Sequence, residues 1–143
     1  FFFFLKYLQK FMKLLFFAAA VREKDNYILS NFSNFVAFPY GPVELKIYGY
    51  IKSKNEKFQF KGNSLILSED FINKISINEG VNDDFKELKK RNIKLINLPA
   101  FDLVDLSVKF SSYRIAHSIA KSKNIYSYPM NKNSIISDVK FFN

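Results

Sequence analysis

The N-terminal segment FFFFLKYLQKFMKLLFFAAAV, residues 1–21, constrains the fold of this chain more than any other feature. At about 100° per residue in a helix, Lys6, Lys10 and Lys13 fall within roughly 60° of one another. The opposite side of this helix carries apolar side chains, namely Phe4, Leu8, Phe11, Leu15 and Ala18. A one-sided apolar stripe predicts an amphipathic helix and not a membrane span.

Two other interpretations of the segment stay open. An interfacial membrane helix has the same pattern, and MKLLFFAAAVRE, from Met12 to Glu23, has the lysine, apolar run and small-residue end of a signal peptide. Docking on the protein's own core is the commoner use of an amphipathic helix. We therefore expect a core helix and no transmembrane segment, with a peripheral membrane protein as a minor alternative.

The composition bounds the domain and its chemistry. Of 143 residues, 48% are hydrophobic and 18% aromatic, which is enough to build a core and argues against intrinsic disorder. We expect a single compact domain over residues 1–143. The sequence has no cysteine and one histidine, His117, which excludes disulfides and thiolate chemistry and argues against a transition-metal site. This composition suits a reducing cytoplasm.

The rest of the pattern predicts a mainly α fold with a small β component (α+β). We expect about six or seven helices together with a short hairpin or small sheet. Residues 27–40, YILSNFSNFVAFPY, are rich in β-branched and aromatic side chains and predict extended segments or a small hairpin. Gly62-Asn63 is a candidate turn between Phe58–Phe60 and Leu65–Leu67.

Capping residues mark two of the later helices. Ser68 is a candidate cap for a helix that ends at about Asn78, and Asn82 is the candidate cap of the next one. Charges fit the dipole of this second helix, because acidic residues fall in its first turn and basic residues in its last. These residues are Asp83 and Asp84, and Lys89, Lys90 and Arg91.

Three further helices are predicted toward the C-terminus. Pro99 opens the first, in which apolar residues recur at helical spacing and charged residues face outward. The apolar set is Phe101, Val104 and Val108, and the outward set is Asp102, Asp105 and Lys109. A second helix runs from Tyr113 to about Lys121, and the last helix has its cap near Asn131.

The dipeptide Gly41-Pro42 is the stiffest joint of the chain. Proline fixes φ near −65° and is favoured at the first position of a helix, while glycine tolerates the turn before it. We expect a helix to start at Pro42, with Val43, Ile47, Tyr50 and Ile51 on one face. Gly41 is expected to need a positive φ, and both residues are expected to be structural.

A search for catalytic motifs is negative. The sequence has no P-loop and no G-x-G-x-x-G motif. His117 with Ser111 or Ser112 and Asp105 has the residue types of a nucleophilic triad, but no nucleophile-elbow sequence surrounds these residues. The acidic pairs at 83–84 and 102/105 have helix-cap or ion-pair explanations. We expect no metal, no cofactor and no enzymatic activity.

The formal net charge of +9 raises the alternative of a nucleic-acid-binding regulator. Only Arg22, Arg91 and Arg114 are arginine among the 22 basic residues, whereas base and phosphate recognition favours the guanidinium group. The lysines are scattered along the chain. We therefore favour a solvated basic surface, and keep the regulator as the competing hypothesis.

Four ordered blocks carry a family resemblance. They are LQKFMKLLFFA (8–18), VAFPYGPVELKIYGYIK (36–52), LPAFDLVDLSVKFSSYRIAHSIA (98–120) and YPMNKNSIISDVKFF (128–142). Together they resemble the Panacea-domain family, the SocA-like antitoxins often encoded by prophages and mobile elements. Phe38 and Tyr113 stand where that family commonly has tryptophan, and Val108 or Lys109 stands where it has histidine.

The resemblance implies a non-enzymatic antitoxin that neutralises a cognate small toxin protein by direct contact; a prophage-encoded accessory protein is a further alternative. Interfaces favour aromatic anchors over central lysines. The candidate partner-binding residues are Tyr40, Tyr48, Lys46, Lys52 and Tyr113, the last from the family pattern. The structural motif is expected to be Phe38, Gly41, Pro42 and Val43.

Overall fold

The computed structural model describes residues 2–53, 58–61, 64–67 and 79–142. This part of the chain is mostly helical with a small antiparallel sheet, which confirms the predicted α+β class. The α-helices are α1 (Phe2–Ala20), α2 (Tyr27–Asn31), α3 (Leu45–Ser53), α5 (Glu79–Arg91), α6 (Ala100–Ser107), α7 (Ser111–Ser122) and α8 (Lys132–Ser137), and η2 (Ile93–Asn97) is a 3-10 helix. The strands are β1 (Phe35–Phe38), β2 (Gly41–Glu44), β3 (Phe58–Lys61), β4 (Ser64–Leu67) and β5 (Tyr128–Pro129).

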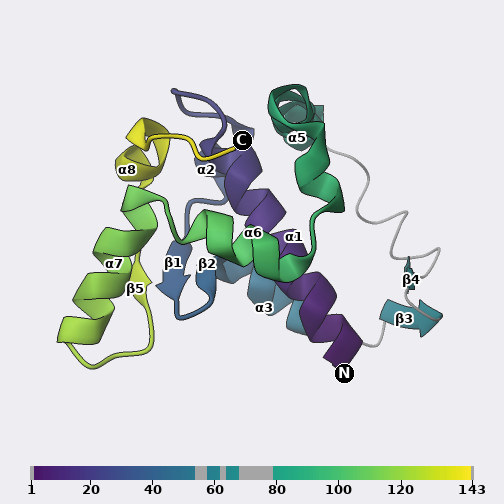
Figure 1. Cartoon of the computed structure of the whole chain (residues 1–143), viewed down its shortest axis with the longest axis horizontal. Coiled ribbons are helices and arrows are strands. Elements are labelled where there is room, and N and C mark those ends of the chain that lie inside the picture. The colour runs from purple at the N-terminus through teal and green to yellow at the C-terminus, as the bar shows by residue number, and fades with distance from the viewer. Residues whose placement is uncertain (1, 54–57, 62–63, 68–78, 143) are drawn as a thin grey trace.

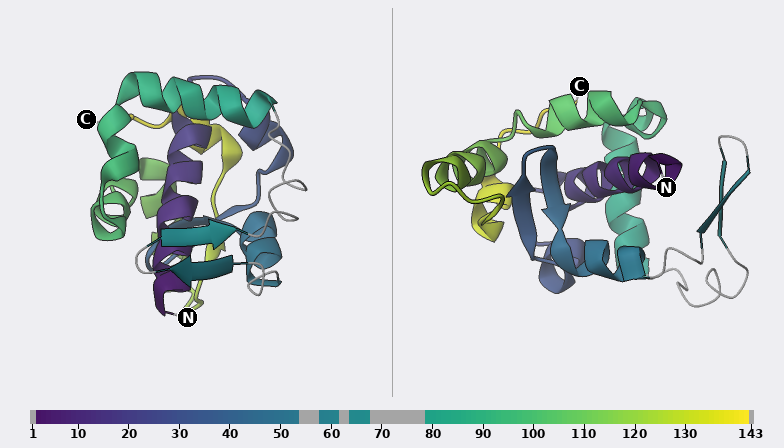
Figure 2. Two further views of the ribbon diagram at one scale, coloured as in Figure 1. Left: turned by 90° about the vertical axis from the view of Figure 1, so that its right-hand side faces the viewer. Right: turned by 90° about the horizontal axis from the view of Figure 1, so that it is seen from below.

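Strand pairing gives one sheet and one separate hairpin. The sheet has the order β2-β1-β5 and is antiparallel throughout. The predicted hairpin is present as the antiparallel pair β3–β4, in which Phe58 lies opposite Leu67. Its expected turn, Gly62-Asn63, and the helix expected from Ser68 to about Asn78 lie outside the described residues. Figure 2 shows the β3–β4 hairpin at the end of the molecule opposite α7.

Helix α1 is the centre of the fold, as its apolar stripe predicts. It contacts α2, α5, α6, α8 and β2, and Figure 1 shows it running between the sheet and α5. The C-terminal part of α1 and the residue after it are buried, because every side chain from Leu15 to Val21 is at most 5% exposed. The Phe110 ring, between α6 and α7, lies 5.1 Å from that of Phe16 on α1 and 5.7 Å from that of Phe142 near the C-terminus. Aromatic contacts therefore link α1, the α6–α7 connection and the C-terminal segment.

The polarity predicted for α1 is wrong at two positions. Lys13, expected on the solvent side with Lys10, is fully buried, and Phe11, expected in the core, is 40% exposed. Periodicity fixes which residues share a side of a helix, but it does not say how many neighbours surround it. Because α6 and β2 both pack on α1, its buried surface extends beyond the apolar stripe and includes Lys13.

Gly41-Pro42 does not open a helix, contrary to the prediction. Both residues belong to β2, where Ala37 lies opposite Pro42 and Phe38 opposite Gly41. Proline is tolerated because β2 is an edge strand. Helix α3 begins three residues after Pro42, where a Glu44 carboxylate oxygen accepts a hydrogen bond from the Ile47 amide at 2.7 Å and caps the first turn.

The face expected for this helix is also only partly right. Val43 is buried in the strand, whereas Ile47 and Ile51 lie on α3 and are half-buried against the core. Tyr50, expected on the same face, is 46% exposed. Gly41 has a φ of 108°, so the expected positive φ is confirmed.

Two later helices differ from the prediction in their buried faces or starts. In α6 the buried residues are Ala100, Leu103 and Ser107, while Phe101 is 82% exposed. Helix α5 begins at Glu79, so Asn82 lies inside the helix and is not its cap. The expected basic last turn of α5 and the Asn131 cap of α8, which accepts from the Ser134 amide at 3.0 Å, are confirmed.

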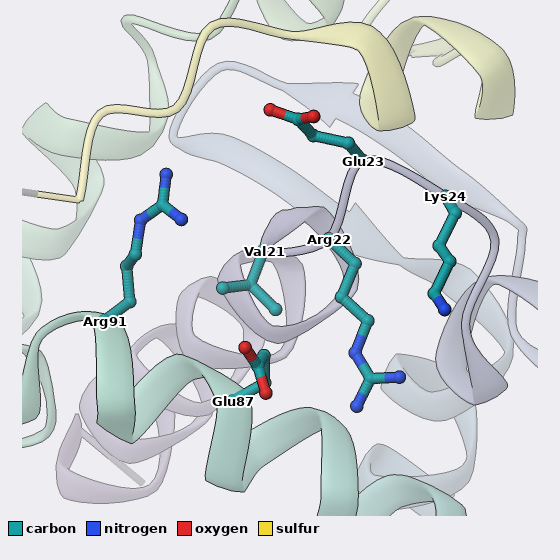
Figure 3. A pocket seen from close by; sticks show the side chains of 6 residues that line it. All are labelled: Val21, Arg22, Glu23, Lys24, Glu87 and Arg91. Atoms are coloured by element: carbon teal, nitrogen blue, oxygen red, sulfur yellow. The ribbon is translucent and has the colours of Figure 1, made fainter.

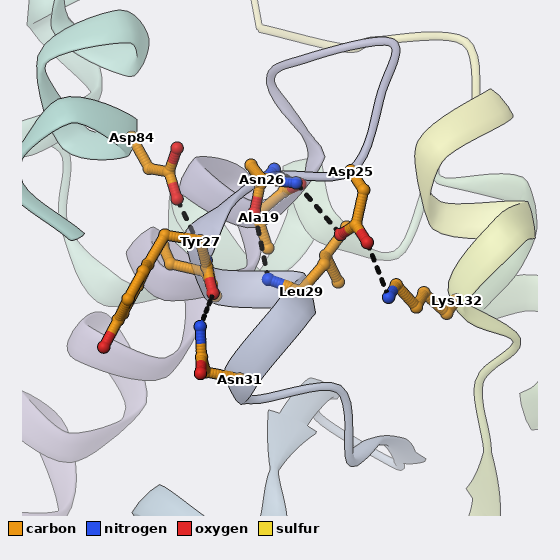
Figure 4. A network of polar contacts seen from close by, with 9 residues as sticks. Ala19, Asp25, Asn26, Tyr27, Leu29, Asn31, Asp84 and Lys132 are labelled. Atoms are coloured by element: carbon orange, nitrogen blue, oxygen red, sulfur yellow. Dashed lines mark hydrogen bonds and ion pairs between the residues drawn. The ribbon is translucent and has the colours of Figure 1, made fainter. Parts of the chain in front are cut away.

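Asp84, expected to serve the start of its own helix, stabilises a different one. It is buried, and its carboxylate accepts a hydrogen bond from the Ile28 amide in the first turn of α2 at 3.0 Å. Figure 4 shows this contact beside the Asn26 side chain, which caps Leu29 and donates to the Ala19 carbonyl at the end of α1. Burial raises the pKa of Asp84 above its usual value, although this backbone hydrogen bond and Arg22 oppose the shift.

Candidate functional site

The β1–β2 hairpin is the structural focus of the candidate site. Its turn is formed by Pro39 and Tyr40, and Phe38 lies opposite Gly41 where the strands close. The Tyr113 hydroxyl, on α7, donates a hydrogen bond to the Phe38 carbonyl at 2.6 Å, and the Pro39 carbonyl lies 3.4 Å from the same oxygen. A side chain from the C-terminal half of the chain therefore holds the turn in place.

The other strand of the hairpin is held by a buried lysine. The Lys13 ammonium nitrogen donates to the Pro42 carbonyl at 3.0 Å. A Cβ atom on Gly41 would lie 2.8 Å from Lys13 Cε and 2.8 Å from Ser107 Oγ. The absence of a side chain at Gly41 is thus what lets α1 and α6 approach β2 this closely.

Burial changes the acid–base chemistry of this lysine. It lowers the pKa of Lys13 from 10.5 to about 7, because burial disfavours the charged form of the amine. A neutral amine beside a serine is reminiscent of serine–lysine catalysis. However, Lys13 and Ser107 are both 0% exposed, and the Ser107 hydroxyl donates to the Val104 carbonyl of its own helix at 2.8 Å. This arrangement supports packing and not reaction with a substrate.

A row of aromatic side chains lies along the hairpin, and we call it the aromatic row. It consists of Tyr48 on α3, Phe38 on β1 and Tyr126 just before β5. The Phe38 ring is 6.1 Å from that of Tyr48, edge to face, and 5.2 Å from that of Tyr126. The Lys52 ammonium lies over the Tyr48 ring, 5.2 Å from its centroid. Tyr126 is 63% exposed, so the row is open to solvent at that end.

The structure separates the predicted partner-binding residues. Tyr40, at the turn, is 59% exposed, and Tyr48 is half-buried in the aromatic row with Lys52 beside it. Lys46 is exposed and lies over the Phe32 ring, 5.5 Å from its centroid. Tyr113 is only 2% exposed, so its assignment as a contact residue is corrected: it supports the hairpin from within.

Ser112 and His117, two residues of the conceivable triad, have other partners in the structure. The Ser112 amide and hydroxyl both donate to Asp138, which caps the start of α7, and burial raises the pKa of Asp138 above its usual value. His117 stacks on Tyr113 with ring centroids 5.2 Å apart and 19° between the planes. The histidine is therefore part of the packing of α7, and Ser112 has another partner.

Charged side chains line one open depression between α5 and the end of α1, with a volume of about 620 Å³. Figure 3 shows its lining, which consists of Val21, Arg22, Glu23, Lys24, Glu87 and Arg91. Three cations and two carboxylates alternate in sign there, so the depression lacks the uniform field that selects an ionic ligand. Among the described residues, no three His, Asp or Glu side chains are grouped closely enough to hold a metal ion.

Sequence reasoning missed two residues of this region. Tyr126 could have been found, because Tyr126 and Tyr128 alternate in the way typical of an extended segment beside Pro129. Lys13 carries no such signal, since a lysine on an amphipathic helix is ordinarily at the surface.

None of the helices in the described ranges has the length and apolar character needed to span a bilayer.

Tyr113→Phe tests the support of the turn. The substitution removes the hydroxyl that donates to Phe38 and leaves a buried carbonyl without that donor. We expect the free energy of unfolding to fall by about 1–2 kcal/mol. Urea denaturation followed by circular dichroism measures this, with Tyr40→Phe as the control, because the Tyr40 hydroxyl is at the exposed turn. Equal stability of the two variants would contradict a supporting role for Tyr113.

Comparison of the chain with protein-family models, with curated proteins and with solved structures found no match.

Proposed function

We propose that this chain is an antitoxin that acts without catalysis, by binding a small protein toxin in the cytoplasm. The observation that carries the proposal is the meeting of the four sequence blocks at one hairpin. Lys13 of the first block and Tyr113 of the third both donate to backbone carbonyls of the second. The Met130 amide of the fourth block donates to the Phe35 carbonyl at 2.8 Å.

This convergence favours a binding role for the hairpin. A surface that is rigid before association loses less conformational entropy when a partner binds. The turn is fixed from α7 and β2 is fixed from α1, while Tyr40 stays 59% exposed between these supports. An exposed tyrosine on a fixed backbone is a typical interface anchor. Two buried polar side chains nearby, Lys13 and Tyr113, are engaged in supporting the hairpin, which favours binding over catalysis.

The test is co-expression of the chain with the product of the adjacent reading frame. We expect the wild type to restore growth and to co-purify with that product. The double variant Tyr40→Ala/Tyr48→Ala is expected to lose at least about tenfold in affinity, since interface tyrosines each contribute on the order of 2 kcal/mol. Phe101→Ala is the matched control, because Phe101 is an exposed aromatic residue on α6.

Thermal unfolding first establishes that all variants are folded. A folded double variant with full neutralisation would move the interface away from Tyr40 and Tyr48. A wild type that neither rescues growth nor co-purifies would count against the antitoxin itself.

A further inference from the structure

We infer that the aromatic row binds an acidic protein surface, one that presents Asp or Glu side chains around an apolar anchor. This inference rests on the proposed function and names the chemistry of the partner. It extends the contact surface of Tyr40, Tyr48 and Lys52 to Phe38 on β1 and to Tyr126 in the segment before β5.

The distribution of carboxylates points to an acidic partner. In the described part of the chain, exposed carboxylates occur in three places only: the α1–α2 connection, α5 and α6. They belong to Glu23, Asp25, Glu79, Asp83, Asp102 and Asp105, with Glu87 half-exposed on α5. The elements that form the aromatic row expose none, because Glu44 at the end of β2 is fully buried.

The same elements and the segment before β5 do expose cations. Lys46 and Lys52 lie on α3, Lys121 lies in the last turn of α7, and Lys123 lies between α7 and β5. None of these four lysines has an exposed carboxylate on the same helix or segment. A negatively charged surface would gain attraction from these lysines during association and would meet no repulsion from the elements of the row.

The state of the rings favours a protein over a single-stranded nucleic acid. Nucleobases bind to aromatic side chains by stacking on their faces. The Tyr48 face is covered by the Lys52 ammonium, and the Tyr48 and Phe38 rings meet at 88°. Lys123 covers Tyr128 in the same way, at 5.2 Å from the centroid. Phosphate recognition also favours arginine, whereas the exposed cations on α3 and in the segment between α7 and β5 are all lysine.

Exposed tyrosine next to apolar phenylalanine fits a protein anchor instead. Phe38 is half-buried and supplies an apolar floor, while Tyr126 extends from it into solvent with its hydroxyl available. Tyrosine beside a desolvated apolar contact and surrounded by rim charges is the usual composition of a binding hot spot.

The inference is tested with the co-purified complex of the full chain and the product of the adjacent reading frame, in a binding titration at two salt concentrations. We expect Tyr126→Ala and Lys52→Glu each to weaken binding by about tenfold or more. Lys52→Glu should also reduce the loss of affinity that salt causes in the wild type. Lys89→Glu, the same charge change at an exposed position of α5, is the control and should change affinity by less than about twofold.

Three outcomes would overturn the inference. Wild-type affinity in both Tyr126→Ala and Lys52→Glu, with the complex intact, would exclude this surface and leave the proposed function standing. Binding of an oligothymidylate that both variants weaken, without protein complex formation, would assign the row to nucleic acid. Failure of the wild type to bind the adjacent product would remove the proposed function and this inference together.

Discussion

Replacing Lys13 with methionine is expected to remove a large pH-dependent term from the stability of this protein. The Lys13 side chain is fully buried, and its pKa falls from 10.5 to about 7 on folding. Between these two values the unfolded chain binds the proton and the native chain releases it. The native state therefore gains stability as the pH rises from 7 toward 10.5, and below pH 7 it carries the full cost of the buried charge.

The size of this effect follows from 1.36 kcal/mol for each pH unit. Between pH 7 and 9.5 we expect the free energy of unfolding to rise by about 3 kcal/mol more in the wild type than in Lys13→Met. At pH 6 the variant should be the more stable protein, by an amount reduced by the lost hydrogen bond to Pro42. Comparison with the variant removes the contributions of other titrating groups.

Denaturant unfolding at a series of pH values measures this difference. Lys10→Met, which removes a partly exposed lysine from the same helix, is the matched control and should keep the pH dependence of the wild type. Parallel pH curves for the wild type and Lys13→Met would show that Lys13 is solvated in the native protein.

A methyl group at Gly41 is expected to destabilise the fold by about 3 kcal/mol. Two independent costs add in Gly41→Ala. The residue has a φ of 108°, which an L side chain rarely adopts, at a cost of about 1 kcal/mol. The new Cβ would also lie 2.8 Å from both Lys13 Cε and Ser107 Oγ, and such overpacking costs a further 1–3 kcal/mol, about 2 at the midpoint.

Gly49→Ala provides the opposite case in the same protein. Gly49 lies inside α3, and apart from its chain neighbours and the local helix backbone no atom comes within 4 Å of the position of its Cβ. We expect this variant to gain about 0.5–1 kcal/mol, because alanine is the better helix former. Thermal or denaturant unfolding of the pair gives the comparison. A Gly41→Ala protein as stable as Gly49→Ala would refute the close approach of α1, α6 and β2.

The polar support of the hairpin has a functional consequence under the proposed function. Gly41→Ala acts on the contacts that hold β2 and leaves Tyr40, Tyr48 and Tyr126 in place. Partner binding by this variant should therefore weaken along with its stability, whereas the Tyr126→Ala variant should lose binding alone. This distinction separates residues that hold the surface from residues that form it.

Local sequence determined the elements whose signals lie within a few residues. The apolar repeat of residues 1–21 determined a core helix, since one side of a helix needs only spacing to be recognised. The Asn131 cap of α8 and the basic last turn of α5 follow from contacts inside one helix, and both are present. The β3–β4 pairing is likewise local, because its two strands are adjacent in sequence.

Tertiary structure decided the features that depend on distant neighbours. Whether Gly41-Pro42 starts a helix or joins a strand depends on the pairing of β1 with β2, because proline is acceptable in both settings. Asp84 serves α2 and not its own helix, since α5 packs beside that helix. Phe101 is exposed and Leu103 is buried, because α6 packs on α1 through the side that carries Leu103. The spacing of apolar residues within α6 does not decide which of these sides faces the core.

Lys13 shows the same division at a single residue. Its sequence position determined that it lies on α1 among lysines, which ordinarily remain in water because burial of an ammonium group is costly. Lys13 is enclosed only because β2 and α6 approach α1 closely at Gly41, which has no side chain. The same approach supplies the Pro42 carbonyl as the hydrogen-bond acceptor of Lys13. The sequence thus determined the helix and the positions of its charges. The packing of elements that are far apart in the chain decided which charge is buried, because desolvation of a side chain depends on all of its neighbours in space and not only on those nearby in sequence.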